Sequence, residues 1–78
     1  MHMKEILNKK ILIVDDEKEL LKTVQDALFK EGFFNLITAS SCREAAAAVK
    51  NQPVALMLLD VNLPDGSGFA LYRELREY

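Results

Sequence analysis

Residues 54–68 read Val-Ala-Leu-Met-Leu-Leu-Asp-Val-Asn-Leu-Pro-Asp-Gly-Ser-Gly, and this stretch decides how the chain folds. Six apolar residues lead directly into Asp60, and the Asn, Pro, Asp and Gly that follow are typical of a turn. A short apolar run bounded by turn residues predicts a strand buried on both faces, as in a parallel sheet. Open α/β folds bind ligands beyond the carboxyl ends of such strands. We therefore expect Asp60 to lie at a ligand-binding site.

A second buried strand is predicted at residues 11–14, Ile-Leu-Ile-Val, which run into three consecutive acids, Asp15, Asp16 and Glu17. Residues 16–31 then have helical spacing. The apolar face of this helix would consist of Leu21, Val24 and Leu28, flanked by Leu20 and Ala27. We expect Asp16 to cap the helix with Glu19 as its capping-box partner, and Gly32 to end it.

Two further βα units complete the pattern. Residues 34–39 predict a weaker strand, and the capping-box sequence of residues 41–44 starts an Ala-rich helix that runs to Lys50. Its predicted buried face is Cys42, Ala45, Ala46 and Val49. Pro53 separates this helix from the strand predicted at residues 54–59. A last helix is expected at residues 69–78, with Leu71, Leu75 and Tyr78 at helical spacing.

Strand and helix alternate three times, which predicts an α/β fold with a parallel sheet. Right-handed crossovers with helices on both faces give the strand order 2-1-3, with the first strand in the centre. The first and third strands are then neighbours that end at the same edge of the sheet. Asp15, Asp16 and Asp60 should converge there.

Three carboxylates held together repel one another unless a cation neutralises them. Mg²⁺ suits this cluster best, because it takes few protein carboxylates and leaves coordination positions for phosphate oxygens. Asp60, on a rigid strand, is the candidate nucleophile for an acyl phosphate, while Asp15 and Asp16 hold the metal. The backbone carbonyl of Asn62 is a further candidate ligand.

Structural interpretations compete with this site. An Asp pair after a strand is often a helix cap, and Asp60 alone would serve to open a turn. Asp65-Gly66 is interpreted as a turn and Lys18 as a solvated lysine, and Cys42 and His2 are given no role. A calcium loop starting at Asp60 is excluded. Its sixth residue should be Gly but is Asp65, and its twelfth should be Glu but is Leu71.

Composition limits the function further. With 78 residues and half of them apolar, the chain can form one globular domain at most. A net charge of −2 offers no basic stripe for nucleic acid, and the apolar runs are too short to span a membrane. The single cysteine favours a reducing, cytoplasmic setting. Residues 1–8 are interpreted as a lead-in, in which Met1-His2-Met3 has the look of a cloning remnant.

Three motifs together resemble the receiver domain, the phosphoacceptor module of bacterial two-component response regulators. They are Lys-Ile-Leu-Ile-Val-Asp-Asp-Glu at residues 10–17, Thr-Ala-Ser-Ser at residues 38–41 and Leu-Leu-Asp-Val-Asn-Leu-Pro-Asp-Gly-Ser-Gly at residues 58–68. The resemblance covers residues 9–78. It implies a flavodoxin-like fold and a phosphoacceptor rather than an enzyme.

The resemblance also assigns the site. It implies that Asp60 accepts phosphate from a sensor histidine kinase or a phosphotransfer protein. It implies that Mg²⁺ is held by Asp16 and Asp60, by the Asn62 carbonyl, and by Asp15 through water.

The family pattern continues beyond this sequence. A receiver has a fourth strand ending in Ser or Thr and a fifth ending in Lys, so residues 9–78 correspond to its first three βα units. We therefore expect a truncated receiver, weakly active or inactive. The strand from Val54 to Leu59 would be an apolar edge, which predicts a homodimer through residues 54–59.

Two other functions fit the same residues. One is a Mg²⁺-dependent phosphoryl-transfer enzyme with Asp60 as covalent nucleophile, although no general acid or base is evident beside it. The other is a self-associating structural half-domain without chemistry. Turnover of a phosphoester would favour the enzyme, whereas the absence of Mg²⁺ binding would favour the structural half-domain.

Overall fold

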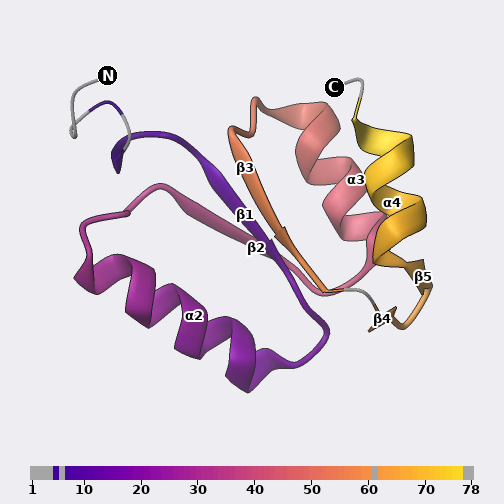
Figure 1. The fold of residues 1–78 in the computed structure, drawn as a ribbon, viewed down its shortest axis with the longest axis horizontal. Coiled ribbons are helices and arrows are strands. Elements are labelled where there is room, and N and C mark those ends of the chain that lie inside the picture. The colour runs from indigo at the N-terminus through magenta and orange to yellow at the C-terminus, as the bar shows by residue number, and fades with distance from the viewer. Residues whose placement is uncertain (1–4, 6, 61, 77–78) are drawn as a thin grey trace.

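The computed structural model describes residues 5, 7–60 and 62–76. Expectations for Met1, His2, Met3 and Tyr78 lie outside these residues. The elements, drawn in Figure 1, are β1 (Ile11–Val14), α2 (Lys18–Lys30), β2 (Leu36–Ala39), α3 (Cys42–Asn51), β3 (Leu56–Leu59), β4 (Asn62–Leu63), β5 (Gly66–Ser67) and α4 (Gly68–Leu75).

The main sheet is parallel and has the strand order β2-β1-β3, as predicted. At its carboxyl end, Val14 of β1 pairs with Ala39 on one side and Leu59 on the other. Figure 1 shows α2 against one face of the sheet and α3 with α4 against the opposite face. The predicted α/β architecture with helices on both faces is therefore confirmed.

The core lies around β1, whose four residues are all buried. Alternate side chains point to opposite faces of the sheet. Leu12 and Val14 pack into a cluster with Leu71 and Leu75 of α4, and Ile11 and Ile13 pack with Leu21 of α2. Each helical layer is thus anchored on the same central strand.

The start of α2 differs from the prediction. Its N-cap residue is Glu17, which makes no side-chain capping bond, so the assignment of the cap to Asp16 is wrong. The Asp15 carboxylate instead accepts a hydrogen bond of 2.9 Å from the Glu17 N–H. This bond forms a local turn ahead of the helix. The predicted helix end is confirmed, because Gly32 follows with φ +96°.

The other capping box forms with a small change. Ser41 caps α3 by accepting from the Glu44 N–H, as predicted. The Glu44 carboxylate accepts from the N–H and the hydroxyl of Ser40, one residue earlier than a standard capping box. The predicted inner face is also confirmed, since Ala45 is buried and Cys42, Ala46 and Val49 pack against the core.

Strand β2 is shorter than predicted because Phe34 leaves the sheet. Its ring lies 4.5 Å from that of Phe29 at the end of α2, measured between centroids, in an edge-to-face arrangement. Both rings remain largely exposed. Pairing with the sheet therefore starts at Leu36.

Strand β3 is not buried on both faces as predicted. Leu56 is 51% exposed and Leu58 38% exposed, because β3 is an edge strand and no described element covers its outer side. Its ladder also starts at Leu56 rather than at residue 54.

The segment after Asp60, predicted as a loop, contains a small antiparallel hairpin formed by β4 and β5. Asn62 pairs with Ser67, and Leu63 pairs with Gly66. Ser67 then caps α4 by accepting from the N–H groups of Phe69 and Ala70. None of the helices in the described ranges combines the length and apolar character needed to cross a membrane.

Candidate functional site

The acidic residues are brought together by the ends of two adjacent strands. The Asp60 N–H donates a hydrogen bond of 2.9 Å to the Val14 carbonyl, so the backbone pairing of β3 with β1 continues to the acid. On the other side of β1, the Asp15 N–H donates 3.1 Å to the Ala39 carbonyl. Both acids are thus fixed by the sheet rather than by loop conformation.

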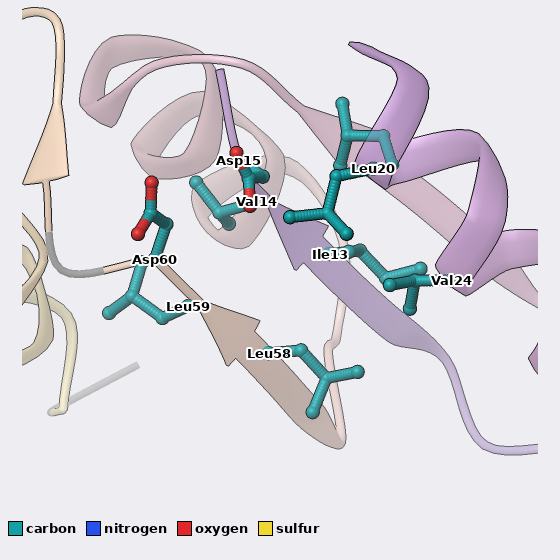
Figure 2. A pocket seen from close by; sticks show the side chains of 9 residues that line it. Ile13, Val14, Asp15, Leu20, Val24, Leu58, Leu59 and Asp60 are labelled. Carbon is teal, nitrogen blue, oxygen red and sulfur yellow. The ribbon is translucent and has the colours of Figure 1, made fainter. Parts of the chain in front are cut away.

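Asp15, Asp16 and Asp60 form one cluster at this edge. Each offers a carboxylate oxygen, and these oxygens all lie within 4.8 Å of one another. Asp15 and Asp60 are half-buried, while Asp16 is exposed. Figure 2 shows the Asp15 and Asp60 side chains at the carboxyl ends of β1 and β3. The convergence expected from the 2-1-3 order is present.

An apolar hollow of about 220 Å³ adjoins the cluster. Asp15 and Asp60 form its polar end, and Leu20, Val24 and Leu58 are among its apolar walls (Figure 2). A low-dielectric wall on one side strengthens the interaction of the carboxylates with any charge placed beside them.

The donor set fits a hard divalent cation. The Glu17 N–H uses one lone pair of Asp15, and the Asn62 N–H lies 3.5 Å from an Asp60 oxygen. A carboxylate has about four lone-pair positions, so most of this acceptor capacity remains for a metal. Oxygen-only ligands at the rim of a rigid sheet are those that Mg²⁺ takes.

Two further residues considered in the sequence analysis lie outside this cluster of carboxylates. Asn62 begins β4 and is exposed, and its carbonyl remains a predicted ligand. Lys18 is exposed in the first turn of α2, in keeping with its interpretation as a solvated lysine.

The turn residue Asp65 has a role that the sequence did not reveal. Its carboxylate accepts hydrogen bonds from the backbone N–H groups of Cys42, at 2.7 Å, and Arg43, at 3.1 Å. Chiefly because of the bond from Cys42, the pKa of Asp65 lies below its ordinary value. Burial, and then the charge of Asp65, raise the pKa of the Cys42 thiol. Asp65 and Cys42 are 23 positions apart, so local sequence carries no signal of the contact.

The sequence also matches a known family. Residues 11–78 match the response regulator receiver domain. The transcriptional regulatory protein YvrH of Bacillus subtilis is 44% identical over 71 residues, covering 91% of this chain and 30% of YvrH. The TorCAD operon transcriptional regulatory protein TorR of Escherichia coli O157:H7 is 45% identical over 69 residues, covering 86% of this chain and 29% of TorR. The chain thus spans less than a third of the length of these relatives.

Solved structures show the same fold. A CheY-like receiver domain from Methylobacillus flagellatus superposes with a TM-score of 0.85 and 31% identity, covering 91% of this chain and 59% of that one. The response regulator TrrA of Thermotoga maritima, in complex with Mg²⁺ and BeF, has a TM-score of 0.82 and 32% identity, covering 88% and 59%. Both the TM-scores and the sequence identities thus relate this chain to receiver domains. This chain belongs to the response regulator receiver domain family.

Proposed function

We propose that this chain is a cytoplasmic phosphoacceptor in which Asp60 receives a phosphoryl group from the phosphohistidine of a sensor histidine kinase or a phosphotransfer protein. One observation carries the proposal: the carboxylate oxygens of Asp15, Asp16 and Asp60 lie within 4.8 Å of one another at the carboxyl edge of the sheet. Family membership and the likeness to a receiver solved with Mg²⁺ and BeF support it.

The step is a substitution at phosphorus. A carboxylate oxygen of Asp60 forms the new bond to phosphorus while the P–N bond of the donor phosphohistidine breaks. The electron pair of that bond returns to the imidazole nitrogen, so the product is an acyl phosphate on Asp60. Holding Asp60 at the end of a paired strand limits its motion, which favours in-line attack.

The metal would be held by Asp15, Asp16 and Asp60, with the Asn62 carbonyl as a fourth protein ligand. When bound, Mg²⁺ stabilises the negative charge of the transferring phosphoryl group. Asp15 and Asp16 flank the nucleophile from the end of β1, so their role is to bind the cation while Asp60 reacts. Without a cation, the two charges would oppose the approach of an anionic donor.

Phosphorylation should be slow and stoichiometric rather than catalytic. In the described residues, no lysine comes directly after a strand of the main sheet, where it would neutralise phosphoryl charge. Removing one electrostatic contact of this kind typically lowers a rate by about 10²–10³.

The test is incubation with acetyl phosphate, with and without Mg²⁺, followed by intact-mass measurement. We expect slow addition of one phosphoryl group to the parent chain only when Mg²⁺ is present. Asp60→Asn should stay unlabelled, whereas the matched control Asp26→Asn, an exposed acid on α2, should label like the parent. Labelling of Asp60→Asn would contradict the assignment, and continued turnover of the donor would favour the phosphoryl-transfer enzyme.

We also propose that the chain self-associates through residues 54–59. The exposed side of β3 carries Leu56 and Leu58. On the opposite face of the sheet, a hollow of about 160 Å³ beside Met57 and Leu75 lies along the same strand. A second copy, paired antiparallel about a twofold axis, would satisfy the open edge and cover these leucines.

A further inference from the structure

The turn between β4 and β5 is tied to a distant helix. The two carboxylate oxygens of Asp65 each accept one hydrogen bond, from consecutive N–H groups of Cys42 and Arg43 in the first turn of α3. First-turn N–H groups have no partner within their own helix. A carboxylate here also interacts favourably with the helix dipole. Because the acceptor is an ionised carboxylate, these hydrogen bonds are stronger than those between two neutral groups.

This cap does more than complete α3, because α3 already has a local one. Ser41 accepts from the Glu44 N–H at 3.1 Å. Asp65, by contrast, comes from more than twenty residues further along the chain. Capping from that distance joins two elements and restricts the position of the hairpin relative to α3.

The hairpin also packs closely on α3. A Cβ atom added at Gly66 would lie 3.1 Å from the Cys42 sulfur, closer than side chains normally approach. Leu63 of β4 is buried in the core cluster that contains Ala45 of α3. Figure 1 shows the hairpin beside the first turn of α3. The hairpin is therefore held by the burial of Leu63, by the close approach of Gly66 to Cys42 and by the hydrogen bonds of Asp65.

This attachment restricts where β4 lies relative to Asp60. β4 begins with Asn62, which pairs with Ser67 and whose N–H lies 3.5 Å from an Asp60 oxygen. A hairpin released from α3 would carry Asn62 with it. We propose that Asp65 is a positioning residue for the Asp15, Asp16 and Asp60 site, acting by tethering the β4–β5 hairpin to α3. The inference rests on the proposed function, since it concerns the Mg²⁺ affinity of that site.

The matched pair for the test is Asp65→Ala and Ser41→Ala. Each removes capping of α3, but only Asp65→Ala releases the hairpin. We expect Mg²⁺ titration to give a dissociation constant about 10-fold higher for Asp65→Ala, the scale of losing support behind metal ligands. Ser41→Ala should keep the parent value. Circular dichroism confirms folding, and Asp65→Asn, which keeps one acceptor oxygen, replaces the alanine variant if that one unfolds.

Cys42 supplies a readout that does not depend on the metal. The Cys42 sulfur lies against Gly66 of the hairpin, and Cys42 is the single cysteine of the chain. Asp65→Asn is the control for this readout, because it removes the charge that, besides burial, raises the pKa of the Cys42 thiol but keeps one acceptor oxygen for the tether. Release of the hairpin should make Cys42 react faster with a thiol reagent in Asp65→Ala than in Asp65→Asn. Equal thiol rates in these two variants, or equal Mg²⁺ affinity in Asp65→Ala and the parent, would overturn the inference alone. A parent chain that binds no Mg²⁺ would overturn it together with the proposed function.

Discussion

Leu20 of α2 and Leu58 of β3 line the same hollow and are both exposed, to 42% and 38% respectively. Leu20 comes from α2 and Leu58 from β3, and the buried Ile13 of β1 lies between them (Figure 2). Leu58 shares the α2 face of the sheet with Ile13 but stays exposed because β3 is an edge strand. Apolar residues on an open edge strand favour pairing with another chain. The self-association proposed above follows from this face and from the edge of β3.

Leu58→Lys should convert the proposed dimer to a folded monomer. The side chain points away from the core, so a lysine there is solvated while its charge opposes edge pairing. Sedimentation velocity at micromolar concentration measures the change. Phe34→Lys is the control, because Phe34 is 64% exposed but lies outside the β3 edge, and it should leave the dimer intact. A parent chain that sediments as a folded monomer would rule out the dimer.

Met57→Lys should unfold the chain rather than only separate the dimer. Met57 is half-buried and packs against the core cluster around Leu12. A lysine ammonium buried there has no partner, and burying an unpaired charge is strongly destabilising. Loss of the helical circular dichroism signal is the expected result. A folded, monomeric Met57→Lys would show that this face of β3 is more accessible than its packing indicates.

Asp60→Asn should have opposite effects on stability with and without Mg²⁺. Without metal, it removes one of three clustered negative charges and should raise the melting temperature by a few degrees at most, since exposed pairs contribute about 1 kcal/mol or less. With metal, it should lose most of the gain the parent shows, which is about 2.7 kcal/mol at 100 times the dissociation constant. Thermal scans with Mg²⁺ and with EDTA measure both. An equal Mg²⁺ response in variant and parent would remove Asp60 from the metal site.

The sequence was sufficient for the topology and for the acidic cluster, because both depend on local patterns. Apolar runs of strand length alternate with helical spacing, and crossover handedness leaves the order β2-β1-β3. Parallel strands end at one edge, so acids at residues 15 and 60 had to meet.

Features that depend on distant partners were not predictable in this way. The contact of Asp65 with Cys42 joins residues 23 positions apart. The exposure of Leu56 depends on which elements flank β3, and an apolar composition alone cannot specify that. The Asp16 cap failed for a local reason, since α2 begins one residue later than predicted, with Glu17 in the N-cap position.

Stability should fall in acid through two carboxylates that accept hydrogen bonds. Bonds from Ser40 lower the pKa of Glu44, and the bond from Cys42 is the main cause of the lowered pKa of Asp65. Because both values are lower in the folded state, the stabilisation is complete above the ordinary values of 4.5 and 3.8 and is lost as pH falls through the folded-state values. Urea unfolding at a series of pH values should show a shallower acid loss in Glu44→Gln and in Asp65→Asn. A slope equal to that of the parent in both would show that the ionised forms do not carry these bonds.

Ser67→Ala should destabilise the chain by about 1 kcal/mol. Ser67 accepts from the N–H groups of Phe69 and Ala70, and the helix it caps supplies Leu71 and Leu75 to the core. Urea titration followed by circular dichroism measures the change. Ser67→Asp keeps an acceptor at the helix start and should retain the parent stability. Equal stability of Ser67→Ala and the parent would mean that packing alone holds α4.

The central position of β1 has a consequence for how the chain is made. β1 is synthesised before β2 and β3, and each of them pairs with β1 and not with the other. During translation, β2 and β3 therefore each find their partner in the main sheet already synthesised. None of these three described strands has to be inserted between two others, so pairing in this sheet can proceed in the order of synthesis. The acidic site is completed last in that order, when Asp60 emerges and reaches the end of β1.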